Sequence, residues 1–597
     1  MNRGRGPGRM ATDKPKGKPT KVLIRLWRYL RRYRWIIVSA SLLSVLSNVL
    51  GLVSPRLSGA AIDAILPGAV DMPVVIKYVI LMVLLAIFSS ALSLVLSAIM
   101  IRLSRSVVTQ MRKDVFDHMT TLPISFFDSY QTGDIISVLS YDIDTVGASL
   151  STDMTQILSS IITVFGSFFM MVTISPTLIA IFAFTIPASI LFTRYRSKVV
   201  RPLFRTRSKM LGKLNGYGEE AVSGLKTIRA YHQEQTFNDR FDFHNDNAVH
   251  ANWHADHTAA VTGPSVNMIN NVSMAAVSMF GSMLYMLGGI SLGGVSSFVL
   301  YSRRFSGPIN EFANIISELQ SALAAAERVL TLLDMDSEVA DAPDALEMKN
   351  SRGHVEFRDV CFGYTEDTQV LHNVSYTAEP GKVIAIVGET GCGKTTMINL
   401  LLRFYDVTSG QILLDGRDIR SITRDSLRRQ FTMVLQDTWL FDGTVYDNIA
   451  YGRPNATREE VIAAAKAAHI HDMIISLPDG YDTIVTDSGN SISKGQKQLM
   501  TIARAMLMDS SMLILDEATS NVDTQTEQRI QDAMLELMHG RICFVIAHRL
   551  STITGADCIL VMDKGRILES GTHAQLLAKR GAYYELYNAQ FDRNEAA

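Results

Sequence analysis

The chain has 597 residues, of which 47% are hydrophobic and 19% are charged. A chain of this length is expected to form two or more domains, and its apolar composition points first to a membrane protein. The formal net charge is -1, from 57 basic and 58 acidic residues, so the overall charge gives no indication of a nucleic-acid partner.

Residues 1–20 are predicted to form a disordered basic arm, because they scatter Lys and Arg among Gly and Pro and cannot pack a core. We interpret the arm as lying near anionic lipid headgroups; a solvated tail with no role is the alternative. The arm lacks the short apolar run and the small-residue cleavage site of a secretory signal. Residues 21–35 alternate Arg with Leu, Trp and Tyr, which favours a helix lying in the membrane interface.

Six apolar stretches follow, and a helix needs about 20 mostly apolar residues to cross a bilayer. The stretches lie near residues 35–55, 76–101, 155–174, 177–193, 259–289 and 294–324. The connections after the second and fourth stretches have the pattern of helices rather than loops, so these helices are expected to continue into the cytoplasm and turn there. Residues 21–335 are therefore predicted to form an all-α transmembrane domain with six helices and long cytoplasmic extensions.

Basic residues flank these stretches unevenly: they precede the first stretch and follow the second and the fourth, as at Arg102, Arg105, Arg194 and Lys213. The positive-inside rule places the N-terminus and the second half of the chain in the cytoplasm. The four cysteines all lie in that second half without disulfide or metal-ligand spacing, which fits a reducing compartment. We therefore expect a multi-pass protein of a cell membrane, of the bacterial inner or plasma membrane type.

Residues 336–354 are polar and acidic, and are predicted to be a linker. After the linker, residues 355–592 alternate short apolar runs typical of strands with helical patterns. This alternation predicts an α/β domain in the C-terminal half.

The segment from Lys382 to Leu401 has the pattern of a buried strand, a glycine-rich turn and an apolar helix, and its sequence GETGCGKT fits the phosphate-binding motif GxxxxGK[ST]. In such a loop the backbone N–H groups surround phosphate oxygens, Lys394 brings a positive charge to the β- and γ-phosphates, and Thr395 offers a hydroxyl to Mg²⁺. The sequence therefore predicts a site for ATP and Mg²⁺, with nucleotide contacts from Gly388, Glu389, Thr390, Gly391, Cys392, Gly393, Lys394, Thr395 and Thr396.

Two further apolar runs end in side chains suited to the same chemistry. The run MLILDE ends in Asp516, which suits Mg²⁺ coordination, and Glu517, which is placed to polarise the attacking water. The run ICFVIAH ends at His548, whose place at a strand end favours contact with the γ-phosphate. The alternatives are a strand that merely ends in exposed acids and a histidine that is structural.

With these motifs in this order, the chain resembles an ABC transporter of the exporter type from about residue 20 to residue 590. The family's other elements are matched by Tyr364 in VCFGYT, Gln436 in MVLQD, SISKGQ from Ser491, and Ser520 to Asp523. The resemblance implies that Tyr364 stacks on adenine, that Gln436 contacts Mg²⁺ or the attacking water, and that His548 is the switch histidine. A half-buried strand tyrosine is the alternative for Tyr364.

The resemblance also implies that Ser493, Gly495, Gln496 and Asp523 contact nucleotide at an interface with a second ATPase domain, so a second half-transporter is the implied partner. The usual signature LSGGQ reads ISKGQ in this chain, with Lys494 in place of a glycine. A side chain there keeps the loop from approaching phosphate as closely as glycine permits; the alternative is a tolerated variation with the lysine pointing to solvent.

The departure from LSGGQ, with VTDSGN before it, resembles heterodimeric multidrug exporters. In those exporters one chain keeps the catalytic glutamate and offers a non-consensus signature to its partner's degenerate site. Because Glu517 and His548 are present, this chain is expected to be the hydrolysis-competent half, with Glu517, His548 and Gln436 as catalytic residues and Thr395, Gln436 and Asp516 at the metal.

Polar residues in the membrane stretches are the candidates for cargo contact. Asn267, Asn270 and Asn271 lie in a Met-rich stretch, and Arg303 and Arg304 lie in the sixth. Such residues either pack helices together or line a path. The methionines adapt to varied apolar shapes, but lipid-facing or core-filling roles are favoured for them.

The sequence as a whole predicts ATP-driven export of amphipathic small molecules, drugs or lipids, with membrane lipids as further partners. The segments at 120–130 and 224–234 are expected to be the coupling helices that transmit ATPase closure to the membrane helices. The alternatives are an importer with an exporter's fold, as for iron chelates, and a regulator that does not transport.

Overall fold

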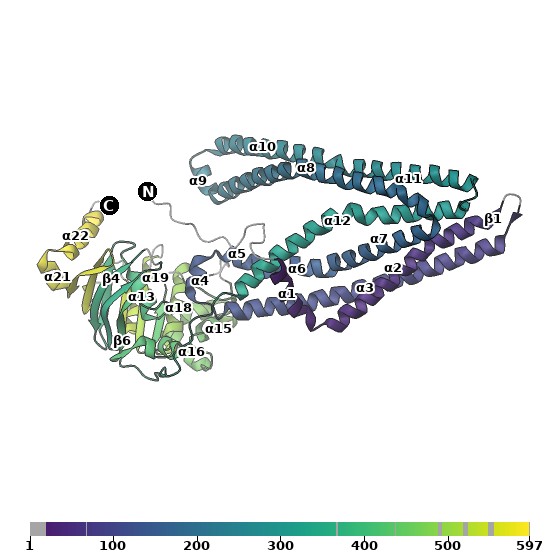
Figure 1. Cartoon of the computed structure of the whole chain (residues 1–597). Helices are drawn as coiled ribbons and strands as arrows, with labels where there is room; N and C mark the ends of the chain where they lie inside the picture. Colours follow the sequence, from purple (N-terminus) through teal and green to yellow (C-terminus); the bar gives the residue numbers. More distant parts are fainter. Residues whose placement is uncertain are drawn as a thin grey trace. The chain divides into compact units, whose positions relative to one another are not determined.

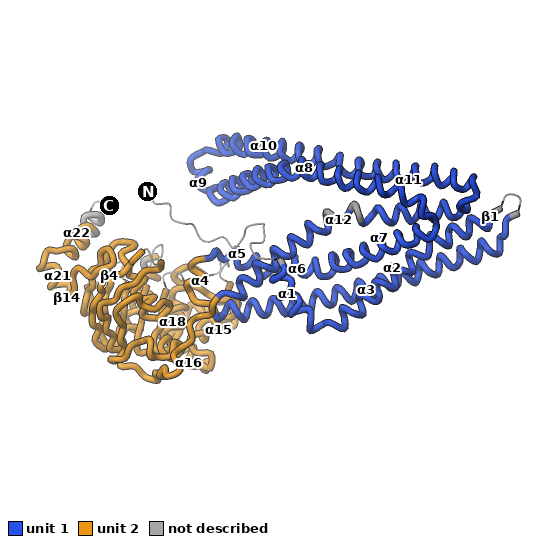
Figure 2. Tube along the Cα trace, in the orientation of Figure 1, with its two compact units in different colours: residues 1–121, 130–335 blue, residues 122–129, 336–597 orange. Residues whose placement is uncertain are grey.

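The computed structural model describes residues 19–66, 69–365, 368–435, 438–486, 492–516, 523–546 and 554–595. The chain divides into two compact units, shown in different colours in Figure 2. The first unit comprises residues 1–121 and 130–335, and the second comprises residues 122–129 and 336–597. The second unit thus includes a short segment from the first half of the chain.

The first unit is built of helices that follow one another with short connections (Figure 1). The helices are α1 (Pro19–Arg31), α2 (Arg34–Asp63), α3 (Met72–Met119), α5 (Thr132–Ser137), α6 (Ile143–Ala148), α7 (Met154–Ile174), α8 (Pro176–Ser223), α9 (Leu225–Ala230), α10 (Glu234–Ala260), α11 (Thr262–Met286) and α12 (Leu292–Leu333). Two π-helical turns, η1 (Val138–Asp142) and η2 (Ser149–Asp153), make α5, α6 and α7 one continuous run. A hairpin of β1 (Ile65–Leu66) and β2 (Ala69–Val70) joins α2 to α3.

Four helical runs are long and apolar enough to cross a membrane, judged by length and composition. They are Arg34–Asp63, Met72–Met119, Thr132–Ile174 and Pro176–Ser223, and they contain the first four predicted spans. The fifth and sixth predicted spans correspond to α11 and α12. Judged on the residues that the structure describes, these two helices do not meet the same criterion of length and apolar composition. The count of six spans therefore stays a prediction.

Close packing of α2 against α12 begins at the ends of the two helices. A Cβ added to Gly293 would lie 1.9 Å from the backbone oxygen of Gly59, so only a residue without a side chain fits. The carboxylate of Asp63 accepts hydrogen bonds from the Ser291 hydroxyl and the Gly293 N–H, each at 2.7 Å. Side chains from α2, α7, α8, α11 and α12 together bury an apolar cluster, which consists of Leu52, Met171, Leu178, Phe182, Val277, Phe298, Tyr301 and Phe305.

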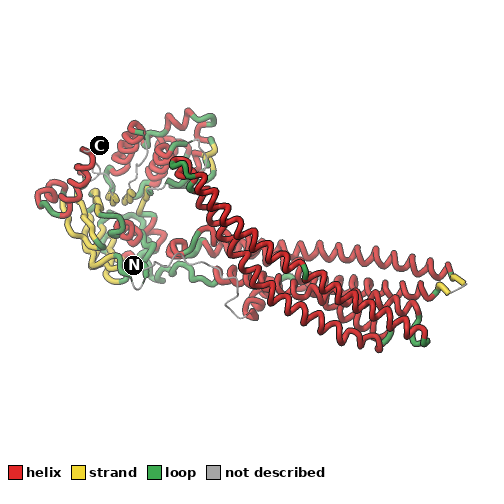
Figure 3. The backbone as a smooth tube through the Cα atoms, turned by 90° about the horizontal axis from the view of Figure 1, so that it is seen from above, coloured by secondary structure: helices red, strands yellow, loops and turns green. Residues whose placement is uncertain are grey.

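The second unit is an α/β domain with one added helix, α4 (Ile124–Ser129), and Figure 3 shows that it holds the strands other than the β1–β2 hairpin. Its strands are β3 (Val355–Phe362), β4 (Leu371–Ala378), β5 (Val383–Gly388), β6 (Ser409–Leu414), β7 (Arg417–Asp418), β8 (Phe431–Val434), β9 (Gly443–Thr444), β10 (Ile484–Val485), β11 (Met512–Asp516), β12 (Ile542–Ile546), β13 (Cys558–Asp563) and β14 (Arg566–Gly571). Its other α-helices are α13 (Lys394–Leu401), α14 (Arg424–Arg428), α15 (Val445–Ala450), α16 (Arg458–Ala467), α17 (His471–Ser476), α18 (Lys494–Met508), α19 (Thr524–Met538), α21 (His573–Lys579) and α22 (Ala582–Glu595). A helical domain followed by an α/β domain is the predicted fold class, which is thereby confirmed in its two parts.

The main sheet of the second unit has the strand order β14-β13-β5-β12-β11-β8, and a second, antiparallel sheet has the order β4-β3-β6-β7. In the main sheet β13, β5, β12, β11 and β8 are parallel. The carboxyl ends of parallel strands meet at one edge of a sheet. That edge therefore brings together the ends of four strands, at Gly388, Val434, Asp516 and Ile546.

The central strand β5 is buried on both faces, as a parallel strand in an α/β domain is expected to be. Its alternate residues Ile384 and Ile386 belong to one apolar cluster, and Ala385 and Val387 belong to another on the opposite face. Burial on both sides fixes β5 in the centre of the unit. The loop that follows β5 therefore starts from a rigid position.

Candidate active site

The predicted phosphate-binding loop connects β5 to α13. Gly393 has a φ of 108°, and a Cβ there would lie 2.7 Å from Cδ2 of Leu371, so the position requires glycine. Helix α13 begins at Lys394, and the N–H groups of a first helical turn have no acceptor within the helix. The end of β5 and the start of α13 thus form the kind of loop that binds phosphate oxygens.

Lys394 is held across this loop. Its side chain is buried, with 7% exposed, and its Nζ donates hydrogen bonds to the backbone oxygens of Gly388 at 2.8 Å and Glu389 at 2.9 Å. Among the residues that the structure describes, no carboxylate forms an ion pair with this ammonium group. A buried cation is stable only with a compensating charge, which a nucleotide phosphate supplies, so the loop fits the group that its motif predicts.

The other predicted contacts of the loop lie around this lysine. The side chain of Cys392 is buried, as is that of Thr396 in the first turn of α13. The remaining positions are exposed at the surface of the loop, as a ligand needs: Glu389, Thr390, Gly391 and Thr395. Thr395 is therefore free to offer its hydroxyl to a metal ion bound with the phosphates.

Tyr364 lies beside the same loop. Its side chain is 46% exposed, and its hydroxyl is 3.1 Å from Oγ1 of Thr396. The ring of Tyr405 meets the Tyr364 ring edge to face, with centroids 5.1 Å apart. An aromatic ring that is half exposed and held in place next to the phosphate loop suits stacking on a base.

In the sequence, the other predicted catalytic residues lie at or shortly after the carboxyl ends of strands β8, β11 and β12 in the main sheet. Asp516 ends β11 directly beside the end of β12, and its side chain is half-buried. Gln436, Glu517 and His548 follow β8, β11 and β12 in the sequence, but they lie outside the described residues. Their roles therefore remain those that the sequence predicts.

The predicted signature residues form the start of α18. The hydroxyl of Ser493 accepts the N–H of Gln496 at 3.3 Å, and the side-chain oxygen of Gln496 accepts the N–H of Ser493 at 2.9 Å. This reciprocal pair is a capping box. Gly495 is buried and Lys494 is exposed. Within this chain Ser493 therefore stabilises a helix start, a role that its S-x-x-Q spacing could have predicted.

Asp523 is the N-cap residue of α19. Its carboxylate accepts the N–H of Thr526 at 2.9 Å at the start of α19. That hydrogen bond lowers the pKa of Asp523, so the carboxylate is ionised at neutral pH. Its contact with nucleotide at a dimer interface stays a prediction.

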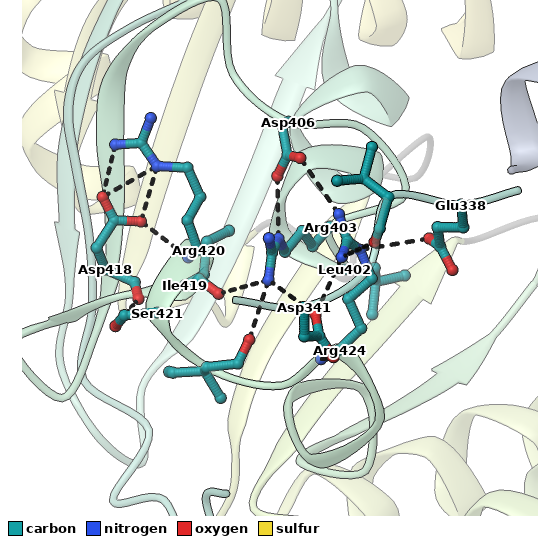
Figure 4. A network of polar contacts seen from close by, with 12 residues as sticks. Glu338, Asp341, Leu402, Arg403, Asp406, Asp418, Ile419, Arg420, Ser421 and Arg424 are labelled. Carbon is teal, nitrogen blue, oxygen red and sulfur yellow. Dashed lines mark hydrogen bonds and ion pairs between the residues drawn. The ribbon is translucent and has the colours of Figure 1, made fainter. Parts of the chain in front are cut away.

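Within the second unit, an ion-pair network, shown in Figure 4, connects residues of the predicted linker to the α/β domain. Asp341 accepts hydrogen bonds from the backbone N–H and the Nη1 of Arg424, both at 3.0 Å, and lies 3.5 Å from Nη1 of Arg403. Glu338 accepts from Arg428 at 2.6 Å, and Asp406 accepts from Arg403 at 3.0 Å. Arg403 and Arg424 are buried. The acidic stretch is thus held by buried cations, which its composition did not predict.

A second contact that the sequence analysis missed joins α4 to the ATPase fold. The hydroxyl of Tyr405 donates a hydrogen bond to Oδ2 of Asp128 at 2.5 Å. Helix α4 lies within the segment 120–130 that was predicted to be a coupling helix. Tyr405 therefore contacts α4 through its hydroxyl and Tyr364 through its ring.

The candidate cargo residues lie in two places of the first unit. Asn267 and Asn271 are exposed and line an open groove along α11 with Met268. Arg303 and Arg304 are exposed, and the guanidinium of Arg304 donates to the backbone oxygen of Gly51 in α2. Arg304 thus connects α12 to α2 through a backbone carbonyl. Contact of these residues with cargo stays a prediction.

Comparison with known proteins agrees with this architecture. Residues 37–309 match the family model of the ABC transporter transmembrane region, and residues 371–520 match the ABC transporter model. The ABC transporter ATP-binding protein YfiC of Bacillus subtilis is 42% identical over 98% of this chain and 96% of its own length. A fatty acid ABC transporter ATP-binding/permease protein of Mycobacterium tuberculosis is 45% identical over 81% of this chain and 76% of its own length.

A solved structure of a bacterial Atm1-family ABC exporter with ATP bound has a TM-score of 0.76 to this chain at 30% identity. The similarity covers 94% of this chain and 98% of that one. The resemblance drawn from the motifs is thereby confirmed, and with it ATP hydrolysis coupled to transport across a membrane. The chain belongs to the ABC transporter family, as an exporter-type half-transporter that carries its membrane part and its ATPase on one polypeptide.

Proposed function

We propose that this chain is the hydrolysis-competent half of a heterodimeric exporter that moves lipids or other amphipathic compounds. The observation that carries the proposal is the buried Lys394 at the start of α13, on the same polypeptide as long apolar helices. An ammonium held over a phosphate-binding loop without a carboxylate partner among the described residues calls for a nucleotide. ATP energy would then act on the membrane helices of the same chain.

We assign roles at the nucleotide site by residue. Thr395, Gln436 and Asp516 would hold Mg²⁺, and Glu517 would polarise the attacking water, with His548 at the γ-phosphate. Bound Mg²⁺ neutralises phosphate charge during the reaction. Support comes from the parallel register, which ends the strands before Gln436, Glu517 and His548 at the edge where the loop begins.

Two observations favour an acyl-chain cargo. The M. tuberculosis relative is named as a fatty acid transporter. In addition, an open and almost wholly apolar cavity of about 550 Å³ lies along α8 and α11, lined by exposed side chains such as Phe184, Phe280 and Met283. An apolar cavity between membrane helices suits a hydrocarbon chain, whereas a hydrophilic solute would lose its hydration there.

The proposal of a heterodimer depends on Lys494. The exposed lysine stands at the first residue of α18, where the family has a glycine. A side chain at that place would keep the signature loop further from a phosphate on the partner. The chain would therefore serve a partner site that binds ATP without hydrolysing it, while Glu517 hydrolyses the ATP at its own site.

The test is co-purification of the native complex, followed by identification of each subunit and by measurement of hydrolysis and lipid flux in inverted vesicles. A second, different half-transporter without the catalytic glutamate is expected, and Glu517→Gln in this chain should stop turnover while nucleotide still binds. A homodimer with two equal active sites would overturn the heterodimer. Cargo movement in the opposite direction would identify an importer, and hydrolysis without any flux would identify a regulator.

A further inference from the structure

We propose that the first unit binds the headgroup of an anionic phospholipid in a cavity beside α1, apart from the cavities assigned to cargo. The cavity has a volume of about 410 Å³ and lies between α1, α3 and α12. Its basic side chains are Arg25 and Arg28 of α1 and Arg32 of the turn that follows α1, and its apolar lining comes from Val107, Leu330 and Leu333. A cationic rim above an apolar floor matches a phosphodiester joined to acyl chains.

The charges around the cavity leave cations available for a ligand. Arg25 forms an ion pair with Asp334 at the end of α12. Asp114, the carboxylate that lines the cavity, accepts hydrogen bonds from Gln110 at 2.7 Å and from Tyr29. Arg28 and Arg32 are exposed and have no carboxylate partner among the described residues.

These two arginines suit a phosphate group in particular. A guanidinium binds phosphate oxygens through two parallel N–H groups, and such charge-assisted hydrogen bonds are stronger than neutral ones. Arg28, in the last turn of α1, and Arg32, in the turn that follows α1, both line the cavity, so their guanidinium groups are available to the same space. One phosphodiester can therefore be held between them.

The place of α1 in the chain puts this cavity at the level of lipid headgroups. Helix α1 ends at Arg31, and α2, the first membrane-crossing helix, begins at Arg34. On the outside of this segment Trp27 is 52% exposed and Trp35 is 74% exposed. Tryptophan concentrates at the boundary between hydrocarbon and water, so these side chains anchor α1 there.

The apolar floor selects a lipid over a free anion. Val107 of α3 and Leu330 of α12 are buried, and a soluble phosphate would gain nothing from them. A lipid would bury its glycerol and first methylenes there, and each buried methylene favours binding. Basic residues at a membrane surface also attract anionic lipid.

The test uses the full-length transporter complex, delipidated in detergent and then titrated with phosphatidylglycerol or phosphatidylcholine while bound lipids are counted by native mass spectrometry. The variant Arg28→Gln/Arg32→Gln removes the two free cations of the cavity. The matched control Arg31→Gln/Arg34→Gln removes two cations from the same segment that do not line the cavity. Each variant removes two positive charges, so nonspecific attraction to anionic lipid falls equally in the two variants.

We expect one tightly held phosphatidylglycerol, at least tenfold weaker binding in the cavity variant, and little change in the control. Equal binding by both variants, or equal binding of phosphatidylcholine, would overturn the proposal. Displacement of the lipid by millimolar inorganic phosphate would identify a site for free anions instead. A second measurement is the quenching of Trp27 fluorescence by brominated phosphatidylglycerol, which reports whether the lipid lies beside α1. We expect this quenching to be lost in the cavity variant and kept in the control.

Binding of ATP by both variants is measured in parallel. Retained ATP binding shows that the second unit is folded, and an unchanged melting temperature of the complex shows that a loss of lipid binding is local to the first unit. Because the cavity lies outside the nucleotide site and the cargo cavity, failure of the proposed export function would leave this lipid site unaffected, and the reverse also holds.

Discussion

The hydroxyl of Tyr405 donates a hydrogen bond to the carboxylate of Asp128 at 2.5 Å, and this bond joins α4 to the loop that follows α13. The same tyrosine packs its ring against Tyr364, whose hydroxyl lies 3.1 Å from Thr396 in the first turn of α13. A continuous series of contacts thus runs from α4 to the phosphate-binding helix. Burial and the bond to Asp128 both raise the pKa of Tyr405, so the phenol keeps its proton at physiological pH.

The variant Tyr405→Phe should reduce the stimulation of ATP hydrolysis by cargo without weakening nucleotide binding. It keeps the ring against Tyr364 and removes only the bond to Asp128, so the KM for ATP should change little. Loss of one hydrogen bond to a carboxylate corresponds to about 1.5 kcal/mol, or roughly a tenfold fall in cargo-stimulated hydrolysis. The measurement is ATPase rate against cargo concentration.

Asp128→Ala should reproduce this effect, and the double variant should add nothing further, because both changes remove the same hydrogen bond. A matched control is Tyr451→Phe, an exposed tyrosine whose ring stacks near Phe441. A change in the KM for ATP with unaltered stimulation would show that Tyr405 acts on the nucleotide alone.

Lys394→Ala should weaken ATP binding by about 2 kcal/mol, or roughly 30-fold, because a charge-assisted contact with the phosphates is lost. The fold should survive, since the lysine is held by local contacts alone, to the backbone oxygens of Gly388 and Glu389 and to the sulfur of Cys392. Fluorescent nucleotide titration measures the affinity, and Lys466→Ala, on an exposed position of α16, is the control. Undiminished affinity would contradict the assignment of the loop.

Removal of Mg²⁺ with EDTA should abolish hydrolysis, and added Mg²⁺ should restore it. Asp516→Asn should raise the Mg²⁺ concentration needed for half-maximal rate, because a carboxylate ligand is replaced by a neutral amide. Glu517→Gln should instead lower turnover by about 100-fold or more at any Mg²⁺ concentration. Metal dependence unchanged by Asp516→Asn would remove that residue from the proposed metal site.

Asp341→Ala should destabilise the second unit by about 2–3 kcal/mol, because buried Arg403 and Arg424 lose a shared counter-ion. Thermal unfolding of the full chain would register the change. The control is Asp425→Ala, whose exposed pair with Arg429 should matter by less than about 1 kcal/mol. Equal effects of the two changes would show that burial of the network contributes nothing.

Stability should depend on pH through Lys382 and Asp557, which lie 2.8 Å apart at the start of β5. The bond from Lys382 lowers the pKa of Asp557 below its usual 3.8, so this stabilisation exists above that value and is lost as the pH falls through the lowered pKa. The same bond raises the pKa of Lys382 above 10.5, so the stabilisation is also lost as the pH rises through that raised value. Asp557→Asn should therefore lower the melting temperature at pH 7, with a smaller difference below pH 3.

Local patterns account for the parts of this site that the sequence predicted. The loop before Lys394 and the strand that ends at Asp516 depend on neighbours within a few residues, so their motifs are sufficient to place them. The bond from Tyr405 to Asp128 and the pairing of Asp341 with Arg424 join segments far apart in the chain. No short-range pattern encodes which distant partner a charged side chain meets, so those contacts needed the folded chain.

The inclusion of residues 122–129 in the second unit has a practical consequence for work with fragments. A soluble ATPase piece cut at the predicted linker would begin after Met335 and so lack Asp128, leaving the Tyr405 hydroxyl to water. Such a fragment could bind nucleotide normally and still report nothing about communication with the membrane. Supplying α4 as a separate peptide, residues 120–130, would show by calorimetry how strongly the two pieces recognise each other when no covalent chain connects them.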